Sequence, residues 1–580
     1  MKKRIRLAFI VGLVFLSACA PYRYTLHTQA YAYLSRSIPR PDTAHTELRF
    51  SEIPFIMPNM QSLQHRAEKL QNRVDNDTEQ EEDARMLQAE LDALWTDYKA
   101  AETMCALAQI RYSQDITSAV WTERYEVLSS SIEPVYGMLV CTALKLSERK
   151  ELRAVYDAER TAELRAASML TSPELASLLQ QEQKIIAEYD RLHVKLTVEG
   201  EGRTWNFEEL MGNQELPFAA WYALYSTYTE RYAEEAAALF CRLLPIRNAI
   251  ATALGFDSYT AYRYAAFGRS CTPDDTRHFC ETTAKQLVPL FLKAQQETAI
   301  DREILYYADT YEQEATMDAV GKTVAAILPE LAEPWQYMIE HDLYDAGRGQ
   351  HRLGGSYTTF LSDYGAPFLF TTWDDSPSMP STLLHEFGHF AGYYFRAEGG
   401  NASGGSLDLA ELDSQGLELL AIPYYDKLFG NRADEAKSVR LADTLYTILS
   451  ACAVDTWEQL VYASNAITPA ALHTAFGEII SRYGLDRMGF TPHSWTEIPH
   501  IFQSPCYYIS YGIGGVSALE LYAKALENPG RAASLFQKLL LREEGANLVE
   551  SLQKCDLTDP MADDTIISIC KFLRKDWLKE

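Results

Sequence analysis

Residues 385–389 read His-Glu-Phe-Gly-His, which places two imidazoles four positions apart. Residues with this spacing share one face of a helix, so His385 and His389 could hold one divalent cation between them. Glu386 follows the first histidine and would lie beside the cation, where a carboxylate can take a proton from a bound water. The run therefore predicts a metal site that activates water.

A catalytic zinc keeps three protein ligands and one open position, so a third ligand must come from elsewhere in the chain. Glu411, in the downstream run Ala-Glu-Leu-Asp-Ser-Gln, is the candidate. Ser414 and Glu418 follow it on the same predicted helix, and we expect them to orient the ligands. By itself the motif also fits an exposed helix with polar pairs, and cobalt or manganese could occupy the same ligands.

Two predicted helices must position these side chains. Pro380 and Ser381 suit the start of the first helix, and Gly399 and Gly400 suit its end. The second helix is expected to begin near Leu407. The apolar face that would bury the first helix consists of Leu383, Leu384, Phe387 and Phe390.

The metal motif and the run Ala-Glu-Leu-Asp-Ser-Gln-Gly-Leu-Glu together resemble the thimet oligopeptidase and oligoendopeptidase F family of zinc peptidases. Further segments agree with that family in the same order, and the resemblance spans roughly residues 198–530. These segments are Val198–Leu210, His341–Tyr357, Pro367–Trp373 and Ile498–Gly514.

The resemblance implies one Zn²⁺ per chain, bound by His385, His389 and Glu411, with Glu386 as the general base. It also implies a mainly α fold, in which two helical lobes flank a deep substrate channel with a small β-sheet beside the metal helix. Short unstructured peptides would be the substrates of such a channel.

The tyrosine-rich segment after residue 498 would supply hydroxyl donors to the oxyanion of the tetrahedral intermediate. Tyr511 and Tyr508 are the best matches, His500 is a nearby transition-state or substrate contact, and Tyr507 is the alternate donor. With 35 tyrosines in the chain, each could instead be a packing residue. Relatives often carry glycines where residues 503–506 read Gln-Ser-Pro-Cys. If Cys506 were exposed, it would make the protein sensitive to thiol reagents.

Substrate contacts are expected around the strand Pro367–Trp373 and the segment before it. Family peptidases bind an extended peptide along an edge strand beside the metal helix. The candidates in this sequence are Gly354, Gly355, Tyr357 and Phe370. An ordinary half-buried strand would show the same alternating pattern.

The first 19 residues resemble a bacterial lipoprotein signal. Basic residues at positions 2–6 precede an apolar run over residues 7–16, and then comes Leu16-Ser17-Ala18-Cys19. The resemblance implies cleavage before Cys19, lipid attachment to that residue and anchoring to a membrane in the bacterial cell envelope. Plain secretion is the alternative.

The composition is acidic, with 53 basic and 80 acidic residues. Removing residues 1–18 would take away four basic residues and no acidic one. Such a charge argues against nucleic acid as a partner. The ten cysteines are scattered through a long chain, which does not indicate a disulfide scaffold.

The periodicity of the chain is overwhelmingly helical, with strand signals only at 194–207 and 366–373. We expect a signal peptide at 1–18, a tether at 19–58, an N-terminal helical domain at 59–195 and a zinc peptidase domain at 196–580. Leu63, Leu70 and Val74 should be core positions of the first helices.

Three functional hypotheses follow. The first is a zinc-dependent oligoendopeptidase of the bacterial envelope. The second is a lipid-anchored peptide-binding or adhesion protein with an inactive peptidase fold. The third, an aminopeptidase or carboxypeptidase, is disfavoured because the chain has no Gly-x-Met-Glu-Asn-type run that would capture a free amine.

Overall fold

The structure is a computed structural model of the 580-residue chain. It describes residues 44–77, 83–156, 161, 164, 173–213, 215–297, 311–349, 351–398, 407–464, 467–543 and 547–580. Cys19, the signal segment and the expected helix end at Gly399 and Gly400 lie outside these residues.

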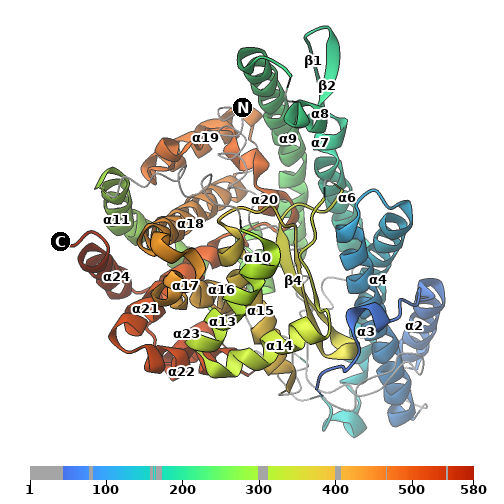
Figure 1. Cartoon of the computed structure of the whole chain (residues 1–580). Helices are drawn as coiled ribbons and strands as arrows, with labels where there is room; N and C mark the ends of the chain where they lie inside the picture. The colour runs from blue at the N-terminus through green and yellow to red at the C-terminus, as the bar shows by residue number, and fades with distance from the viewer. Residues whose placement is uncertain are drawn as a thin grey trace.

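Helices dominate the described chain, and the N-terminal helices α2, α3 and α4 lie on the opposite side of the molecule from α11, α19 and α24 (Figure 1). Helix α15, which carries the metal motif, and α16 lie between these two groups. The α-helices are α2 (Met60–Asn76), α3 (Ala84–Gln114), α4 (Ala119–Leu146), α6 (Pro173–Asp190), α7 (Leu192–Lys195), α8 (Phe207–Gly212), α9 (Phe218–Ala253), α10 (Tyr259–Ala266), α11 (Pro273–Glu297), α13 (Gln313–Ile327), α14 (Ala332–Glu340), α15 (Met379–Glu398), α16 (Leu407–Leu420), α17 (Tyr425–Phe429), α18 (Ala433–Tyr462), α19 (Pro469–Arg482), α20 (Pro499–Gln503), α21 (Ile509–Glu527), α22 (Pro529–Leu540), α23 (Leu548–Lys554) and α24 (Asp563–Asp576).

The predicted helical character of the chain is confirmed. The expected core positions Leu63, Leu70 and Val74 are buried. Two helices cover the periodic stretch 60–115, because α2 ends at Asn76 and α3 begins at Ala84, as expected for a charge-rich helix-helix connection at 75–85. Helices α4 and α9 have the length and apolarity that a bilayer would require, but about half of each apolar window is buried inside the molecule, as is common for long core helices.

Two small sheets complete the fold. Strands β1 (Thr197–Gly200) and β2 (Arg203–Asn206) form an antiparallel hairpin at the predicted position. The second sheet has the order β3-β5-β4, built from β3 (Tyr344–Asp345), β4 (Ser356–Leu361) and β5 (Ala366–Thr371). Strand β4, which was not predicted, pairs antiparallel with β5. The strand expected at Pro367–Trp373 as the edge that binds a peptide corresponds to β5, which lies between β3 and β4, so that expectation is corrected.

The central sheet separates the N-terminal helices from the metal helix. Tyr357 of β4 donates to Ser113 of α3 at 3.0 Å, whereas Thr358 donates to Glu386 of α15. Successive side chains of a strand point to opposite faces, so α3 covers one face of the sheet and α15 the other.

Residues 44–58 differ from the expected tether, because they pack on the body. Phe50 is buried, and its ring lies 4.3 Å from that of Phe368 on β5. The amide of Thr46 donates to Tyr364 O at 2.8 Å. The next residue, Gly365, has a φ of 56°, and its lack of a side chain lets the backbone of Ala44 pack directly against it. The expected tether therefore does not extend over residues 44–58, and its first part, residues 19–43, lies outside the described residues.

The buried core is continuous from Phe50 to Trp577. The N-terminal helices and the rest of the body therefore share one hydrophobic interior. The domain boundary between residues 195 and 196 stays a prediction.

Candidate metal centre and active site

Three candidate metal ligands converge between α15 and α16. One ligand atom from each of His385, His389 and Glu411 lies within 4.8 Å of the other two. His385 Nε2 lies 3.9 Å from Glu411 Oε2. His389 and Glu411 are buried, whereas His385 remains partly exposed.

Two glycines allow the helices to approach closely enough for this convergence. A Cβ on Gly388, inside the metal motif, would lie 2.4 Å from Asp413 O of α16. A Cβ on Gly514 of α21 would lie 3.0 Å from the Cβ of Glu411. Side chains at either position would push α16 away, so the glycines help to place Glu411 near the histidines.

Glu418 orients the first histidine. Its Oε1 lies 2.8 Å from His385 Nδ1, and its other carboxylate oxygen accepts a hydrogen bond from Arg440 of α18. Burial would raise the pKa of Glu418, but the charge of Arg440 and the contact with His385 hold that pKa below its usual value. The ionised carboxylate directs the opposite ring nitrogen, Nε2, toward the other ligands.

Two hydroxyls contact Glu411, the third candidate ligand. Tyr507 donates to Glu411 Oε1 at 2.6 Å, and Ser414 donates to Glu411 O at 3.1 Å with a longer contact of 3.5 Å to Oε2. Tyr507 was expected only as an alternate oxyanion donor. In the structure its hydroxyl instead contacts the carboxylate of Glu411, a candidate ligand, and no local sequence signal indicated this contact.

The candidate general base is held by a residue that the sequence analysis missed. Thr358 Oγ1 lies 2.8 Å from Glu386 Oε2 and 2.9 Å from Glu386 O. Burial raises the pKa of Glu386 to about 7, although the charge of His385 and the Thr358 hydroxyl act in the opposite direction. A bound cation would lower that pKa further. The alternation of the strand around Tyr357 could have revealed Thr358, had β4 been predicted.

His500 and the expected tyrosines form an aromatic cluster. The hydroxyl of Tyr511 lies 3.4 Å from His500 Nε2, and the ring of Tyr508 lies 5.2 Å from that of Tyr511. Burial lowers the pKa of His500 to about 4, so this imidazole is neutral near pH 7. Burial raises the pKa of Tyr508 to about 12, so its phenol keeps the proton that a donor needs.

The turn before these tyrosines is held rigidly by buried side chains. Cys506 has a φ of 63°, a left-handed conformation that glycine adopts more easily. Its carbonyl accepts from Arg269 at 2.6 Å, and its amide donates to Glu458 at 2.9 Å. Cys506 is itself buried, so the exposure that thiol sensitivity at this position would require is not present.

The four expected substrate contacts lie on different surfaces. Tyr357 and Phe370 are buried on the α3 face of the sheet, where their rings stack 5.1 Å apart. This placement corrects the expected role of both side chains, because strand alternation turns them away from Glu386. Gly354 is exposed and Gly355 half-buried at the start of β4, where a peptide could still reach them.

The ligand set fits a transition-metal cation such as zinc. His389 Nε2 is buried and has no hydrogen-bond partner among the described residues. Burial holds the pKa of His389 well below its usual value, which leaves the neutral imidazole that metal binding requires. Tetrahedral zinc with bonds of about 2.1 Å separates its ligand atoms by about 3.4 Å. Small side-chain rotations would bring the ligand atoms of His385, His389 and Glu411 from their present separations to that distance.

Comparisons with known proteins agree with the resemblance found in the sequence. The profile of the Peptidase M3 N-terminal domain matches residues 50–164. Oligopeptidase PepF of Bacillus subtilis (strain 168) is 22% identical over 348 residues, which are 55% of this chain and 50% of the Bacillus protein. The matched region therefore spans about half the length of that relative.

Solved structures show the same fold over most of the chain. A protein assigned as an oligoendopeptidase F has a TM-score of 0.76 and 23% identity, covering 92% of this chain and 99% of that chain. PZ peptidase A with an inhibitor has a TM-score of 0.75 and 21% identity over the same shares. Oligoendopeptidase-F from Enterococcus faecium has a TM-score of 0.58 and 15% identity, covering 89% of this chain and 96% of that chain.

The fold is thus the mainly helical fold of the oligoendopeptidase F structures, with a possible metal site between α15 and α16. The resemblance to the thimet oligopeptidase and oligoendopeptidase F family is confirmed.

Proposed function

We propose that this chain is a zinc-dependent endopeptidase that hydrolyses internal bonds of short peptides. The convergence of His385, His389 and Glu411 beside Glu386 carries this proposal. The M3-type N-terminal match and the likeness to an oligopeptidase support a peptidase.

Zinc held by this trio would polarise the scissile carbonyl and lower the pKa of a bound water. Glu386 would take the proton from that water and return it to the leaving amine. Its raised pKa, about 7 before any cation is bound, reflects a carboxylate that can exchange a proton near neutral pH. The hydroxyl of Thr358 keeps one oxygen of Glu386 fixed and leaves the other for the reaction.

Tyr508 and Tyr511 are the proposed donors to the oxyanion, with His500 beside them. A protonated phenol can donate to a developing negative charge without competing as an anion. The neutral His500 contacts the hydroxyl of Tyr511 and would orient it.

Strand β4 is the proposed surface for the extended peptide. The order β3-β5-β4 leaves β4 at an edge of the sheet within the described chain, and Thr358 on this strand touches the general base. Backbone pairing along β4 would hold a peptide without reading most of its side chains. Gly354 and Gly355 at the start of the strand would let the peptide backbone come close.

The test uses the protein from residue 19 onward, with Glu386→Gln as the inactive control. The expected result is one zinc per chain and cleavage of quenched fluorescent peptides, lost in the variant. Substrates with both ends blocked should still be cut at internal bonds. Metal binding and peptide binding without turnover in the wild type would instead favour the inactive, peptide-binding alternative.

We also propose that the protein is anchored in the bacterial cell envelope by lipid on Cys19, with no role in nucleic-acid binding. The Leu-Ser-Ala-Cys sequence after a short apolar run supports this proposal. Metabolic labelling with an alkyne fatty acid should mark the wild-type protein and miss Cys19→Ser. Equal labelling of both, or none, would contradict the anchor.

A further inference from the structure

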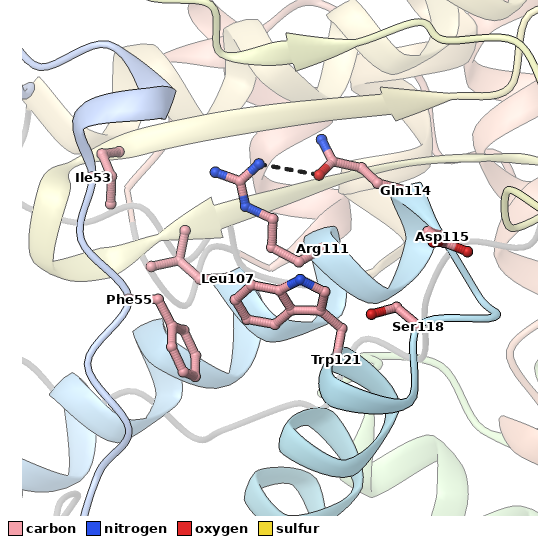
Figure 2. A pocket seen from close by; sticks show the side chains of 8 residues that line it. All are labelled: Ile53, Phe55, Leu107, Arg111, Gln114, Asp115, Ser118 and Trp121. Atoms are coloured by element: carbon pink, nitrogen blue, oxygen red, sulfur yellow. Dashed lines mark hydrogen bonds between the residues drawn. The ribbon is translucent and has the colours of Figure 1, made fainter.

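A cavity lies away from the metal centre, at the junction of α3 and α4. Its volume is about 430 Å³, within the usual range of ligand sites (Figure 2). Phe55, from the N-terminal segment, and Trp121, in the first turn of α4, form an aromatic wall with ring centroids 5.1 Å apart and planes nearly perpendicular. Ile53 and Leu107 extend the apolar lining.

The cavity and the metal centre belong to opposite faces of the central sheet. Helix α3 meets the sheet at Tyr357, and α15 meets it at Thr358. The connection between α3 and α4 is nevertheless joined to the segment before β4, because the amide of Ile116 donates to His351 O at 2.8 Å. A ligand in the cavity would therefore lie near the start of the proposed peptide-binding strand.

Arg111 gives the cavity a positive charge that the protein does not neutralise directly. Arg111 Nη1 donates to Gln114 Oε1 at 3.1 Å, and no carboxylate of the described chain forms an ion pair with Arg111. The nearby Asp345 is already used by Arg352 at 2.6 Å, by the side-chain amide of Gln114 at 2.6 Å and by the amide of Gly347. The guanidinium is half-buried, so water screens its charge less than that of an exposed arginine.

The first turn of α4 adds to the positive potential. Ser118 lines the cavity as the N-cap of this helix, its side chain makes no capping hydrogen bond, and the first turn contains no acidic residue. Helix N-termini favour anions. Asp115 also lines the cavity, but its carboxylate is exposed and accepts from the amide and hydroxyl of Thr117, so solvent screens its opposing charge.

We propose that this cavity binds a carboxylate carried by an aromatic or apolar residue, namely the C-terminal residue of a peptide. The carboxylate would meet Arg111 and the start of α4, and the side chain would lie against Phe55 and Trp121. Only the choice of a peptide as the source of the carboxylate rests on the proposed function.

The test is calorimetric binding to the Glu386→Gln protein, which requires no turnover and so remains informative if the peptidase proposal fails. The probes are acetyl-Ala-Ala-Ala-Phe with a free C-terminus, the same peptide with a C-terminal amide, acetyl-Ala-Ala-Ala-Ala with a free C-terminus, and phenylacetate. Because hydrogen bonds between charged groups are strong, the free acid should bind about tenfold more tightly than the amide. Arg111→Met should abolish that preference.

Arg124→Gln is the matched control, because Arg124 lies over the rings of Phe55 at 5.0 Å and Trp121 at 4.6 Å without lining the cavity. This variant should keep the preference for the free acid. Trp121→Leu should reduce the preference for a terminal Phe over a terminal Ala and leave the preference for the free acid intact. This second variant tests the cavity independently, in case Arg111→Met does not fold. Equal binding of acid and amide, or an unchanged preference in folded Arg111→Met, would overturn the proposal. Phenylacetate binding as tightly as the peptide would overturn the assignment to peptide ends.

Discussion

At the scale of single residues, hydroxyl groups set the geometry of the candidate active site. Thr358 contacts the proposed base, and Tyr507 contacts the proposed third ligand. Both hydroxyls contact a buried carboxylate that would otherwise lack part of its hydrogen bonding. Their roles differ, since one acts on proton transfer and the other on metal affinity.

Thr358→Val keeps the shape of the side chain and removes the hydroxyl. Because a hydrogen bond to a charged group contributes about 1.5–3 kcal/mol, we expect kcat/KM to fall by about 10- to 100-fold. The hydroxyl lowers the pKa of Glu386, so its loss should move the acidic limb of the rate profile to higher pH. Rate measurements across pH test both effects.

Thr359→Val is the control for this prediction, because Thr359 is the next residue on β4 and points to the other face of the sheet. Its kcat/KM and pH profile should match those of the wild type. Identical profiles for Thr358→Val and the wild type would remove Thr358 from the mechanism.

Tyr507→Phe should weaken zinc binding and Tyr508→Phe should not. The hydroxyl of Tyr507 fixes Glu411, and losing a group that orients a metal ligand typically costs about 10- to 100-fold in metal affinity. Tyr508→Phe should instead lower kcat with unchanged metal content. Competition with a zinc chelator measures the affinity, and equal affinities for both variants would argue against the role of Tyr507.

At the scale of elements, α16 is the central piece of the site. It packs between α15 and α21, so its residues reach the metal motif on one side and the tyrosine segment on the other. Arg269, in the segment between α10 and α11, joins these parts. It contacts Asp408 of α16 at 3.2 Å, Cys506 O at 2.6 Å and the hydroxyl of Ser510 at 2.7 Å.

Arg269→Met should destabilise the protein by about 3–5 kcal/mol, because it leaves the buried carboxylate of Asp408 without its cationic partner and, among the described residues, with only the hydroxyl of Ser510 to donate a hydrogen bond to it. Urea unfolding of the metal-free protein measures the change. Arg277→Met removes an exposed ion pair with Asp274 and should change the stability by at most about 1 kcal/mol. A similar small change for both variants would show that the Arg269 network does not stabilise this junction.

At the scale of the whole molecule, the helical body removes several ionisable groups from full contact with water. Glu458 of α18 is a buried carboxylate, and Glu497 is half-buried. Burial raises the pKa of Glu458 to about 8 and that of Glu497 to about 7. Stability of the fold should therefore depend on pH even without the active site.

The direction of this pH dependence follows from the number of protons that the folded and unfolded chains bind. Between about pH 4 and pH 8 the unfolded chain has ionised glutamates while folded Glu458 keeps its proton, so the free energy of unfolding falls as pH rises. The urea midpoint should therefore drop across this range. Glu458→Gln should show a smaller drop, since the amide can still accept from Cys506 and cannot ionise.

Glu478→Gln, at an exposed position of α19, is the control and should show the wild-type dependence on pH. If Glu458→Gln also followed the wild-type curve, the carboxyl of Glu458 would have to titrate alike in the folded and unfolded chains.

The sequence by itself determined the properties that depend on local spacing. The four-residue interval between His385 and His389 predicts their shared helix face, and the apolar residues around them predict the buried side of α15. Helical periodicity determined the fold class for the same reason, because side-chain position along a helix follows from residue number.

Only the tertiary structure decided which distant groups meet. Tyr507 reaches Glu411 because the left-handed turn at Cys506 and the approach of α21 bring them together. Thr358, and not Tyr357, faces Glu386 because of the register of a strand that short-range patterns did not reveal. These contacts join segments far apart in the chain, so their geometry depends on packing that no local spacing encodes.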